Sequence, residues 1–565
     1  MTTGYDLPTP GDGNRTGSRG ETGGSLGTEV DPDAWDGFEW QIPETYNIAS
    51  VALDHDADRT ALRHLDADGD SYEFTYGELE RAADALAADL RHNGVESGDR
   101  VAVCLPQCPE HAVVHLAAYR CGAVTVPLSM LLGQETVRYQ LADCGVHTLL
   151  LDAQRATELP DGVTDPADRV VTVATGSGDY ERAPRALGGL AAVVDDEASA
   201  PAAETSPDDP AVILYTSGTS GHPKGVLQSH AYLLGSLPGY HCCFHLFDDA
   251  DCRDALLWTP SEWAWAGALF DVVLPTLATG GTVLSTERRT GFEPSRALER
   301  IDEESVTHAF FPPTALARMR SETDPSAYDL GSLGVVMCGG EKLQPAVFEW
   351  AESELGVTVN ETYGQTEANM LVGNCRVAFP ATSGSMGKPY PGHDVVVVDE
   401  DGDPLPPGEL GEIAVAPPDP VTLIEYWDDP EATEAKFLDD GLMLTGDLAR
   451  RDEDGYLFHA GRKDHLIITS GYRVSPLEVE SVLTEEPRVA SAVVGGVPDA
   501  ERGQRVKAYL RLTDGHEPSA ALADELRDHV RERLGAHKTP RDIEFIESIP
   551  ETRSGKTDRT TLFSE

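Results

Sequence analysis

Hydroxyl side chains and glycines stand in front of one lysine in the run Tyr215-Thr216-Ser217-Gly218-Thr219-Ser220-Gly221-His222-Pro223-Lys224-Gly225. The run follows a strand-like apolar stretch at 211–215. Glycine lets a backbone approach a polyphosphate and turn its N–H groups toward it, while hydroxyls and an ammonium add donors. The run therefore indicates a phosphate-binding loop. It differs from the ordinary P-loop, because Pro223 precedes the lysine and Gly225, rather than Ser or Thr, follows it.

Five shorter motifs follow farther along the chain: Asn360-Glu361-Thr362-Tyr363-Gly364-Gln365-Thr366-Glu367, Thr445-Gly446-Asp447, Gly461-Arg462-Lys463-Asp464, Gly471-Tyr472-Arg473 and Arg553-Ser554-Gly555-Lys556. Together with the loop, their order and spacing resemble the adenylate-forming superfamily, which includes acyl-CoA synthetases, firefly-type luciferases and peptide-synthetase adenylation domains. The resemblance runs from about residue 40 to the end of the chain. Within the superfamily, the pattern most resembles the AMP-forming medium-chain acyl-CoA synthetases.

The resemblance implies a ligase that uses ATP, Mg²⁺ and coenzyme A. A carboxylate would first displace pyrophosphate from ATP, and CoA would then take the acyl group from the acyl-adenylate. Because two anions must meet in the first step, cationic groups and N–H donors are the expected catalysts. The implied catalytic residues are Lys556, Lys224 and Glu367. Glu367 and Thr216 are the implied Mg²⁺ ligands, since Mg²⁺ prefers hard oxygen donors.

The implied nucleotide site draws on several motifs. The stretch Gly340-Glu341-Lys342 would wall the adenine pocket, Tyr363 would stack on the base, and Asp447 would accept hydrogen bonds from the ribose. A turn-forming Asp is the alternative interpretation of Asp447. The full implied set for ATP and AMP is Thr216, Ser217, Gly218, Thr219, Ser220, Gly221, Lys224, Gly340, Glu341, Lys342, Glu361, Thr362, Tyr363, Gly364, Gln365, Thr366, Asp447, Arg462 and Lys556.

Asp464 matches the family's hinge, at which the C-terminal unit rotates between the two half-reactions. The rotation would withdraw Lys556 and bring another face of that unit to the site. The implied CoA contacts are Ser470, Gly471, Tyr472, Arg473 and Arg502. An exposed loop is the alternative interpretation of this segment.

Three residues are candidates for the acyl pocket. Gly364 stands where acetyl-specific relatives carry a tryptophan that floors the pocket, which favours medium-chain, branched or aromatic acids over acetate. Trp263 and Trp265 fall where the family builds another wall, with core packing as their alternative role. Amino-acid-activating relatives carry an aspartate at the position of Gly267, so an α-ammonium would have no partner here.

Other functions stay open beside a CoA ligase. An acyl-AMP ligase would load a carrier protein, and a short-chain ligase would use acetate or propionate. A non-catalytic binding protein with this fold is disfavoured by the complete set of lysine, glutamate and aspartate motifs. The partners that we expect are the acid, ATP and CoA, with no nucleic acid and no membrane span, and we consider a homo-oligomer. Acetylation of Lys556 would remove its charge and stop the first step.

Secondary-structure signals place these motifs in an α/β protein. A helix is predicted at 76–93, and apolar strands alternate with helices from about residue 40 to 150 and again from 211 to about 345, with a variable connection at 161–209. Short strands and turns dominate after about 390. The strands predicted in this way lie at 100–105, 147–151, 211–215, 282–285, 308–311, 333–338, 395–398 and 412–415. The predicted domains are a disordered tail at 1–34, an N-terminal adenylation domain at 35–463 and a mobile α+β C-terminal domain at 464–565. The N-terminal domain would hold two α/β-layered sheets and a barrel-like β subdomain at about 390–463.

The composition points to a salt-rich cytoplasm. The 565-residue chain carries a net charge of −54, although charged residues make up only 25% of it, and eight of its 43 basic residues are lysines. Such a surface repels itself and nucleic acid until concentrated salt screens it. No apolar run is long enough to span a membrane, and the N-terminus lacks a signal-peptide pattern. The nine cysteines form no Cys-x-x-Cys pair, so we expect buried thiols rather than disulfides or a zinc site.

Overall fold

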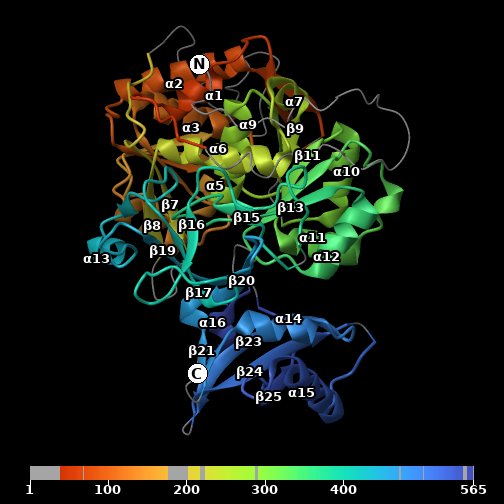
Figure 1. Cartoon of the computed structure of the whole chain (residues 1–565). Coiled ribbons are helices and arrows are strands. Elements are labelled where there is room, and N and C mark those ends of the chain that lie inside the picture. Colours follow the sequence, from red (N-terminus) through yellow and green to blue (C-terminus); the bar gives the residue numbers. More distant parts are fainter. Residues whose placement is uncertain are drawn as a thin grey trace. The chain divides into compact units, whose positions relative to one another are not determined.

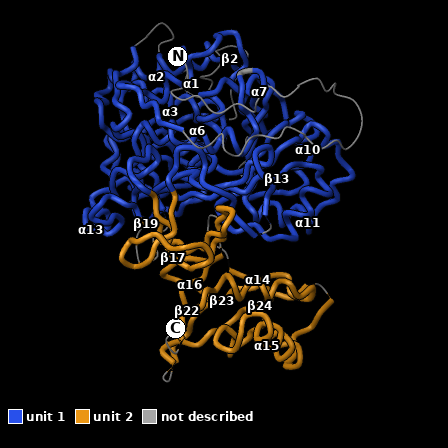
Figure 2. The backbone as a smooth tube through the Cα atoms, in the orientation of Figure 1, with its two compact units in different colours: residues 1–394, 416–443 blue, residues 395–415, 444–565 orange. Residues whose placement is uncertain are grey.

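The computed structural model describes residues 38–67, 69–175, 201–216, 223–286, 291–382, 384–469, 472–499, 502–513, 515–550 and 557–563 (Figure 1). The chain forms two compact units (Figure 2): unit 1 contains residues 1–394 and 416–443, and unit 2 contains residues 395–415 and 444–565. The predicted tail at 1–34 lies outside the described residues. The small sheet at 395–462 thus groups with the C-terminal sheet, and the domain boundary at residue 464 stays a prediction.

The larger sheet of unit 1 has nine strands within the described ranges, in the order β15-β14-β13-β12-β11-β9-β10-β1-β2. The strands are β1 (Thr60–Leu65), β2 (Ser71–Thr75), β9 (Leu256–Trp258), β10 (Thr282–Thr286), β11 (His308–Phe311), β12 (Val335–Gly339), β13 (Thr358–Tyr363), β14 (Val372–Gly373) and β15 (Lys388–Pro389). The six strands from β13 to β1 run parallel. Their carboxyl ends therefore share one edge, which is where open α/β sheets bind ligands.

The second sheet of unit 1 has seven strands in the described part, in the order β18-β8-β7-β4-β3-β5-β6. They are β3 (Arg100–Cys104), β4 (Val124–Pro127), β5 (Thr148–Asp152), β6 (Arg169–Val173), β7 (Pro210–Thr216), β8 (Lys224–Ser229) and β18 (Glu425–Tyr426). The strands from β6 to β7 are parallel, while β8 and β18 add to the edge in antiparallel fashion. The apolar strand predicted before the phosphate-binding loop is therefore confirmed as β7.

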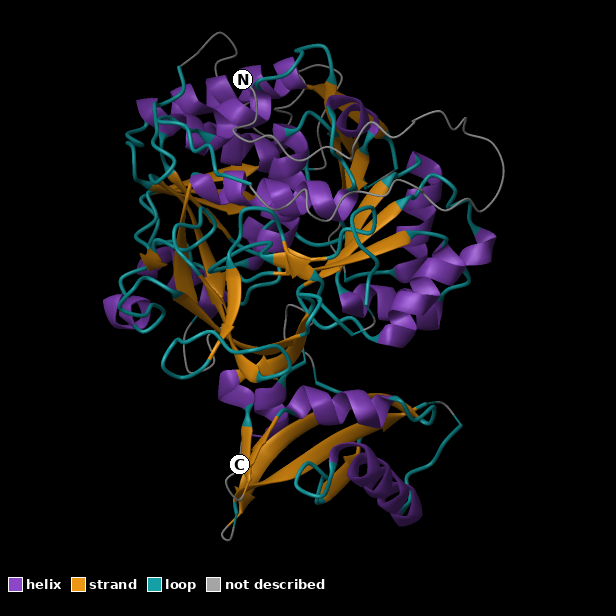
Figure 3. Cartoon of the chain, in the orientation of Figure 1, coloured by secondary structure: helices purple, strands orange, loops and turns teal. Residues whose placement is uncertain are grey.

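Helices cover both faces of the nine-stranded sheet (Figure 3). Alternate residues of β12 explain this, because Val336 packs toward α10 and α11 whereas Met337 packs toward α6. All residues of α6 are buried, and α6 contacts strands of both sheets. The helices of unit 1 are α1 (Ile48–Leu53), α2 (Tyr76–His92), α3 (Pro109–Cys121), α4 (Gln134–Asp143), α5 (Ala153–Glu158), α6 (Ala231–Phe244), α7 (Asp249–Asp254), α8 (Ala266–Ala268), the π-helix η3 (Leu269–Val273), α9 (Leu274–Ala278), α10 (Pro294–Glu304), α11 (Pro313–Glu322), η4 (Pro325–Ala327), α12 (Pro345–Trp350), the π-helix η5 (Ala351–Leu355) and α13 (Pro430–Glu434).

Unit 2 contains a four-stranded sheet, β16-β17-β19-β20, and a five-stranded sheet, β22-β21-β24-β23 with β25 beside β24, as far as the structure describes it. The strands are β16 (Val395–Val398), β17 (Leu410–Val415), β19 (Met443–Arg451), β20 (Leu457–Arg462), β21 (Ile467–Thr469), β22 (Tyr472–Val474), β23 (Val489–Asp499), β24 (Gly503–Leu512) and β25 (Asp542–Phe545). The helices are η6 (Lys463–His465), α14 (Pro476–Thr484), α15 (Ala520–Leu534) and α16 (Arg559–Phe563). Ser475 caps α14 and donates a hydrogen bond to the Ala460 carbonyl, which joins the two sheets.

The observed architecture confirms the predicted α/β fold with a large body of layered sheets and a C-terminal α+β domain. All nine cysteines fall in the described part of the chain, where they are buried and form no disulfide. No helix in the described ranges is long and apolar enough to cross a membrane.

Candidate functional site

The ends of the predicted phosphate-binding loop lie on neighbouring strands of unit 1. Thr216 at the end of β7 pairs directly with Lys224 at the start of β8. Residues 217–222, which include the predicted contacts Ser217, Gly218, Thr219, Ser220 and Gly221, lie outside the described residues. The hairpin register nevertheless brings the loop's hydroxyl and its lysine to the same end of the sheet.

The ammonium of Lys224 lies against an acidic and aromatic surface. Lys224 Nζ is 2.9 Å from Asp429 Oδ2 and 5.3 Å from the ring centroid of Tyr426. Asp429 also caps α13, because its Oδ1 accepts a hydrogen bond from the Ala432 N–H at 3.0 Å. The hydrogen bond from Lys224 and the cap lower the pKa of Asp429. A carboxylate thus holds the lysine at the mouth of the loop.

Glu367 belongs to the same cluster. The hydroxyl of Tyr426 donates to Glu367 Oε1 at 2.6 Å, and the Leu423 N–H donates to the Glu367 carbonyl at 2.8 Å. No hydrogen bond to the other carboxylate oxygen comes from the described residues. That oxygen is the type of donor that Mg²⁺ prefers, so Glu367 fits the predicted role of metal ligand. Lys224, Asp429, Tyr426 and Glu367 are called the loop-mouth cluster below.

Two side chains fix the backbone of the motif that ends in Glu367. Gln228 of β8 and Tyr232 of α6 donate to the Thr366 carbonyl at 2.8 and 3.2 Å. The Gln365 N–H donates to the Ala368 carbonyl at 2.7 Å, which closes a tight turn. The sheet that carries the phosphate-binding loop therefore holds the turn that carries the acid.

The predicted adenine wall follows β12. A Cβ at Gly339 would lie 2.7 Å from Thr362 of the neighbouring strand, so the strands approach closely here. Gly340 has φ of +90° and open space where a side chain would stand. Glu341 and Lys342 come next, and the Leu343 N–H contacts the Glu361 carboxylate at 3.4 Å. Burial raises the pKa of Glu361 to about 8, which favours the neutral acid near pH 7.

The predicted base-stacking residue Tyr363 ends β13, on the parallel strand next to β12. Residues 339–342 and Tyr363 therefore lie at the carboxyl edge of the sheet, as the prediction of an adenine pocket requires. Gly364 follows at once, and a Cβ there would lie only 2.4 Å from the Met370 backbone nitrogen. Backbone packing by itself thus demands glycine at this position.

The two candidate tryptophans of the acyl pocket differ in environment. Trp263 is only 1% exposed, and its ring packs edge-on against His111 of α3 with centroids 5.6 Å apart. Trp265 is half-buried and precedes α8 as its N-cap residue. The alternative role of core packing therefore suits Trp263 better than Trp265.

The surroundings of Gly267 differ from the expectation that an ammonium would have no partner there. A Cβ at Gly267 would lie 3.3 Å from the Phe310 ring and 3.6 Å from Asp271 Oδ2. An acid therefore stands beside this position, although it is supplied by the residue four places later. The expectation considered residue 267 alone, and a helix brings residues i and i+4 to the same face.

In unit 2 the structure brings three predicted residues together. Asp447 and Arg462 are paired across β19 and β20, with Asp447 Oδ1 3.8 Å from Arg462 Nε. The same Nε lies 3.4 Å from Asp464 Oδ1. The predicted ribose acceptor, its neighbouring arginine and the predicted hinge residue thus form one charged group.

Two contacts fix the glycine turn beside that charged group. Lys463 Nζ lies 2.7 Å from Glu412 Oε2, and Glu412 Oε1 accepts a hydrogen bond from the Gly446 N–H at 2.9 Å. Gly446 has φ of +78°, a conformation that glycine adopts without strain. Glu412 is buried at 7% exposure, so its two hydrogen-bonded partners compensate for its burial.

The predicted CoA segment is only partly described. Ser470, Gly471 and the side chain of Arg473 lie outside the described residues, whereas Tyr472 is 57% exposed and lies beside His537 with ring centroids 4.8 Å apart. Ile468 on the paired strand is 55% exposed. The backbone N–H of Arg502 donates to Asp499 at 3.0 Å. Two exposed apolar side chains therefore flank the turn predicted to meet the pantetheine arm.

Lys556 lies outside the described residues, but the chain on both sides of it is anchored in unit 2. The Asp558 N–H donates to the Pro550 carbonyl at 2.8 Å. Arg559 Nη2 lies 2.6 Å from Glu480 Oε1 of α14, and its Nη1 donates to the Val494 carbonyl at 2.5 Å. The described residues that come before and after positions 551–556 are thus hydrogen-bonded to each other and to unit 2.

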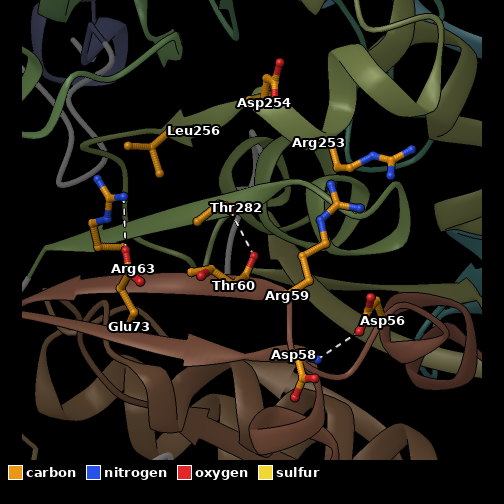
Figure 4. Close-up of a pocket in the computed structure, with 11 residues that line it drawn as sticks. Asp56, Asp58, Arg59, Thr60, Arg63, Glu73, Arg253, Asp254, Leu256 and Thr282 are labelled. Carbon is orange, nitrogen blue, oxygen red and sulfur yellow. Dashed lines mark hydrogen bonds and ion pairs between the residues drawn. The ribbon is translucent and has the colours of Figure 1, made fainter.

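A separate surface hollow of about 570 Å³ lies between β1, β2, β9, β10 and α7 (Figure 4). Arginines and acids line it, and Arg63 pairs with Glu73 at 3.1 Å. Thr282 Oγ1 donates to the Thr60 carbonyl at its floor at 2.9 Å. The residues that line this hollow include none of the predicted site residues, so we assign it no role in the reaction.

Sequence reasoning missed Tyr426, Asp429 and Asp271. Tyr426 ends the two-residue strand β18, and Asp429 is the N-cap of α13, where the Asp-Pro pair signals only a helix start. Asp271 lies in an apolar stretch, where an unpaired acid was a signal that could have been noticed. The sequence could not predict the contacts of these three residues, because the contacts depend on how distant segments pack together.

Comparison with known proteins gives a consistent result. The family model described as AMP-binding enzyme matches residues 50–427, and the AMP-binding enzyme C-terminal domain matches residues 478–556. An uncharacterized acyl-CoA ligase, YtcI of Bacillus subtilis, is 32% identical over 522 residues, which are 92% of this chain and 96% of that protein. Acetyl-coenzyme A synthetase of the same organism is 32% identical over 528 residues, 91% of this chain and 90% of that protein. The solved anthranilate CoA ligase AuaEII with anthranoyl-AMP is 26% identical, with a TM-score of 0.79 over 92% of this chain and 97% of that one.

Proposed function

The chain belongs to the AMP-binding enzyme family and is related over most of its length to acyl-CoA ligases, and from this we propose that it joins a medium-chain, branched or aromatic carboxylic acid to coenzyme A. The reaction consumes ATP and releases AMP and pyrophosphate. The loop-mouth cluster is the observation that carries this proposal. In it, a lysine from the phosphate-binding loop and an acid from the motif at 360–367 converge on Tyr426.

In the first half-reaction, the ammonium of Lys224 leaves Asp429 and neutralises charge on the phosphates of ATP. Lysine suits this contact because it is a compact point charge, whereas a plain surface ion pair would accept arginine equally well. Tyr426 keeps Glu367 oriented by its hydrogen bond at 2.6 Å. Lys556 then bridges the substrate carboxylate and the α-phosphate, which lowers the repulsion between the two anions.

We assign the metal to Glu367 and Thr216. When bound, Mg²⁺ would offset the negative charge of the phosphate oxygens. Glu367 holds one carboxylate oxygen in the hydrogen bond from Tyr426 and keeps the other for the ion. Asp447 and Arg462 of unit 2 serve the ribose, with Tyr363 and residues 340–342 around the adenine.

In the second half-reaction, rotation at Asp464 withdraws Lys556 and presents the hairpin of β21 and β22. The exposed side chains of Ile468 and Tyr472 support this role, because an apolar surface beside a glycine turn suits the passage of a pantetheine arm. Arg473 and Arg502 serve the CoA phosphates. Acetylation of Lys556 would silence only the first half-reaction, since it removes the ammonium.

The choice of acid follows from the absence of a tryptophan at position 364. A pocket without that floor holds more than two carbons, and the half-buried Trp265 gives it an aromatic wall. The names of the related proteins do not decide between acetate and a larger acid, since they include an acetyl-coenzyme A synthetase and an anthranilate CoA ligase.

The test is the release of AMP and pyrophosphate with CoA over a series of acids from acetate to decanoate and substituted benzoates. We expect CoA-thioester formation with kcat/KM at least about tenfold higher for an acid of six carbons or more than for acetate, because each buried methylene contributes about 0.8 kcal/mol. A preference for acetate would refute the substrate assignment but would still agree with the proposed CoA-ligase activity. Pyrophosphate exchange without thioester would indicate transfer to a carrier protein instead.

We also propose that the enzyme works in a salt-rich cytoplasm. The net charge of −54 is spread over the chain, and molar salt shortens the Debye length to about 3 Å, which removes most of the self-repulsion. The folded fraction should therefore fall as potassium chloride is withdrawn from molar to millimolar concentration, as followed by circular dichroism. Undiminished stability in dilute buffer would contradict this proposal.

A further inference from the structure

Asp271 is a buried acid that the reaction described above does not use. It lies in the π-helix η3 and is only 6% exposed. Asn369 Nδ2 donates to its Oδ1 at 2.5 Å, and Asn369 Nδ2 also donates to Ser236 Oγ at 3.0 Å. The described residues give Oδ2 of Asp271 no hydrogen bond. Oδ2 is also not one of the fully enclosed oxygens without a partner, so it keeps some access to open space that a ligand atom could use.

The free oxygen faces a small gap beside Gly267. The built position of a Cβ at Gly267 is 3.6 Å from Asp271 Oδ2 and 3.3 Å from the Phe310 ring. A side chain at 267 would therefore contact Oδ2, whereas glycine leaves the Cβ position itself open. The gap therefore has an apolar wall, Phe310, and a polar wall, the carboxyl group of Asp271.

The position of this gap links it to the adenylation motifs. Phe310 lies near the carboxyl end of β11, on the face that packs toward α6. Asn369, which holds Asp271, comes two residues after Glu367 and five after Gly364. Trp265 precedes the same helical stretch that carries Gly267. A Cβ at Gly364, which is assigned to the acyl pocket, would lie 3.0 Å from the backbone of Asn369, the residue that holds Asp271.

The local backbone supports a functional rather than a structural role. Residues 269–273 form a π-helix, a wide turn that is rare in proteins and frequent at functional sites. Burial raises the pKa of Asp271 to about 7, against the opposing effect of the hydrogen bond from Asn369. Asp271 therefore exists in both protonation states near neutral pH. A hydroxyl partner suits both, because it donates to a carboxylate and accepts from a carboxylic acid.

We propose that Asp271 is a specificity-determining residue of the acyl pocket, and that its Oδ2 forms a hydrogen bond with a hydroxyl group on the acid substrate. This inference rests on the proposed function and narrows it to hydroxy acids. An ammonium would also satisfy a carboxylate, but it carries three donors, and the two walls of the gap named above, Phe310 and Oδ2 of Asp271, offer it one acceptor. A substrate without a polar group would leave Oδ2 buried without any partner.

The test compares matched acids in the full-length enzyme at molar potassium chloride. Pyrophosphate release is measured for straight-chain and aromatic acids, for their hydroxy derivatives at each position and for the corresponding amino acids. We expect at least one hydroxy acid to exceed its parent acid in kcat/KM by about tenfold or more, since a site built for a hydroxyl discriminates strongly against its absence. Asp271→Leu should abolish or invert that ratio, and Asp271→Asn should reduce it.

Asp84→Asn is the matched control, because Asp84 is a second partly buried aspartate, paired with Arg120 far from these motifs in sequence. It should leave the ratio of kcat/KM between hydroxy and parent acids unchanged.

Equal kcat/KM for hydroxy and parent acids in the wild type, or an equal loss for both in the Asp271 variants, would overturn the inference while leaving the proposed ligase activity intact. Preference for an amino acid would replace the hydroxyl by an ammonium and also overturn it. A wild type that activates no acid at all would defeat the proposed function, and this inference with it.

Discussion

Lys224 and Asp429 form an ion pair of 2.9 Å although they are 205 positions apart along the chain. The pair exists because β18 adds to β8 at the edge of the seven-stranded sheet, with Tyr426 opposite Val226. In the proposed reaction, Asp429 would therefore compete with the phosphates of ATP for the ammonium. Both side chains are more than one-third exposed, at 40% and 37%, so the competition is modest and depends on salt.

Asp429→Asn should lower the KM for ATP by a factor of about 1.4 to 5 in dilute salt, and less at molar potassium chloride. The range follows from an exposed ion pair worth about 0.2–1 kcal/mol. Asparagine still provides the Oδ1 acceptor that caps α13, so the fold should be preserved. Initial rates at varied ATP and two salt concentrations measure the effect. A higher KM would mean that Asp429 orients the lysine for phosphate instead of competing for it.

The sequence was most informative where a pattern is local. The helix predicted at 76–93 is α2, which Thr75 and Glu78 begin with a complete capping box. The strand predicted at 308–311 is β11 at the same bounds. Ser475 caps α14, whereas Glu478 of the same helix pairs with Lys538 at 2.5 Å, a contact that no local motif indicates. Local propensity thus predicted elements well because few residues decide them.

The site was predictable as a set of motifs but not as a geometry. The motif at 360–367 identifies Glu367, whereas its hydrogen bond to Tyr426 depends on where β18 joins the sheet. The acid beside Gly267 was missed because it comes from the next helical turn. The roles assigned to Lys556 and to residues 217–221 stay predictions, since they lie outside the described residues. The motifs could be predicted because they are local, whereas the geometry of the site depends on pairing between distant strands, which no local pattern in the sequence encodes.

Lys556→Ala should reduce adenylation by about a hundredfold or more, the scale of losing one electrostatic contact in a transition state. Thioester formation from a supplied acyl-adenylate should remain largely intact, because in the proposed reaction the lysine acts only in the first step. Pyrophosphate exchange and CoA-thioester assays measure the two steps separately. Lys507→Ala is a matched control in the same unit, since Lys507 pairs with Glu544 at 2.9 Å, and both steps should survive it. An equal loss of both steps in Lys556→Ala would contradict the rotation at Asp464.

Gly364→Ala should destabilise the protein by about 1–3 kcal/mol, the usual range for overpacking a tight site. The added Cβ would meet the Met370 backbone nitrogen at 2.4 Å, and a backbone atom cannot swing aside as a flexible side chain does. Denaturant unfolding at constant high salt measures the change. Gly291→Ala provides the comparison, because nothing lies within 4 Å of its Cβ position and its stability should stay within about 0.5 kcal/mol. If Gly364→Ala were as stable as the wild type, the segment 368–370 would be able to move, and a tryptophan at 364 would fit as well.

Asp271→Asn should flatten the pH dependence of stability between about pH 4 and pH 7. Burial raises the pKa of Asp271 from 3.8 to about 7, so the folded protein holds a proton in this interval that the unfolded chain releases. Stability is therefore greatest below pH 4 and falls as the pH rises through 7, by an amount on the order of a few kcal/mol. Two other titratable groups face this carboxyl from α6, Tyr232 and Cys243, and burial raises the pKa of both beyond the interval. Unfolding free energies of wild type and variant at molar potassium chloride should thus converge at pH 4, with the variant more stable at pH 8. Parallel curves for the two proteins would show that Asp271 is ionised throughout and that its burial is offset by a group other than Asn369.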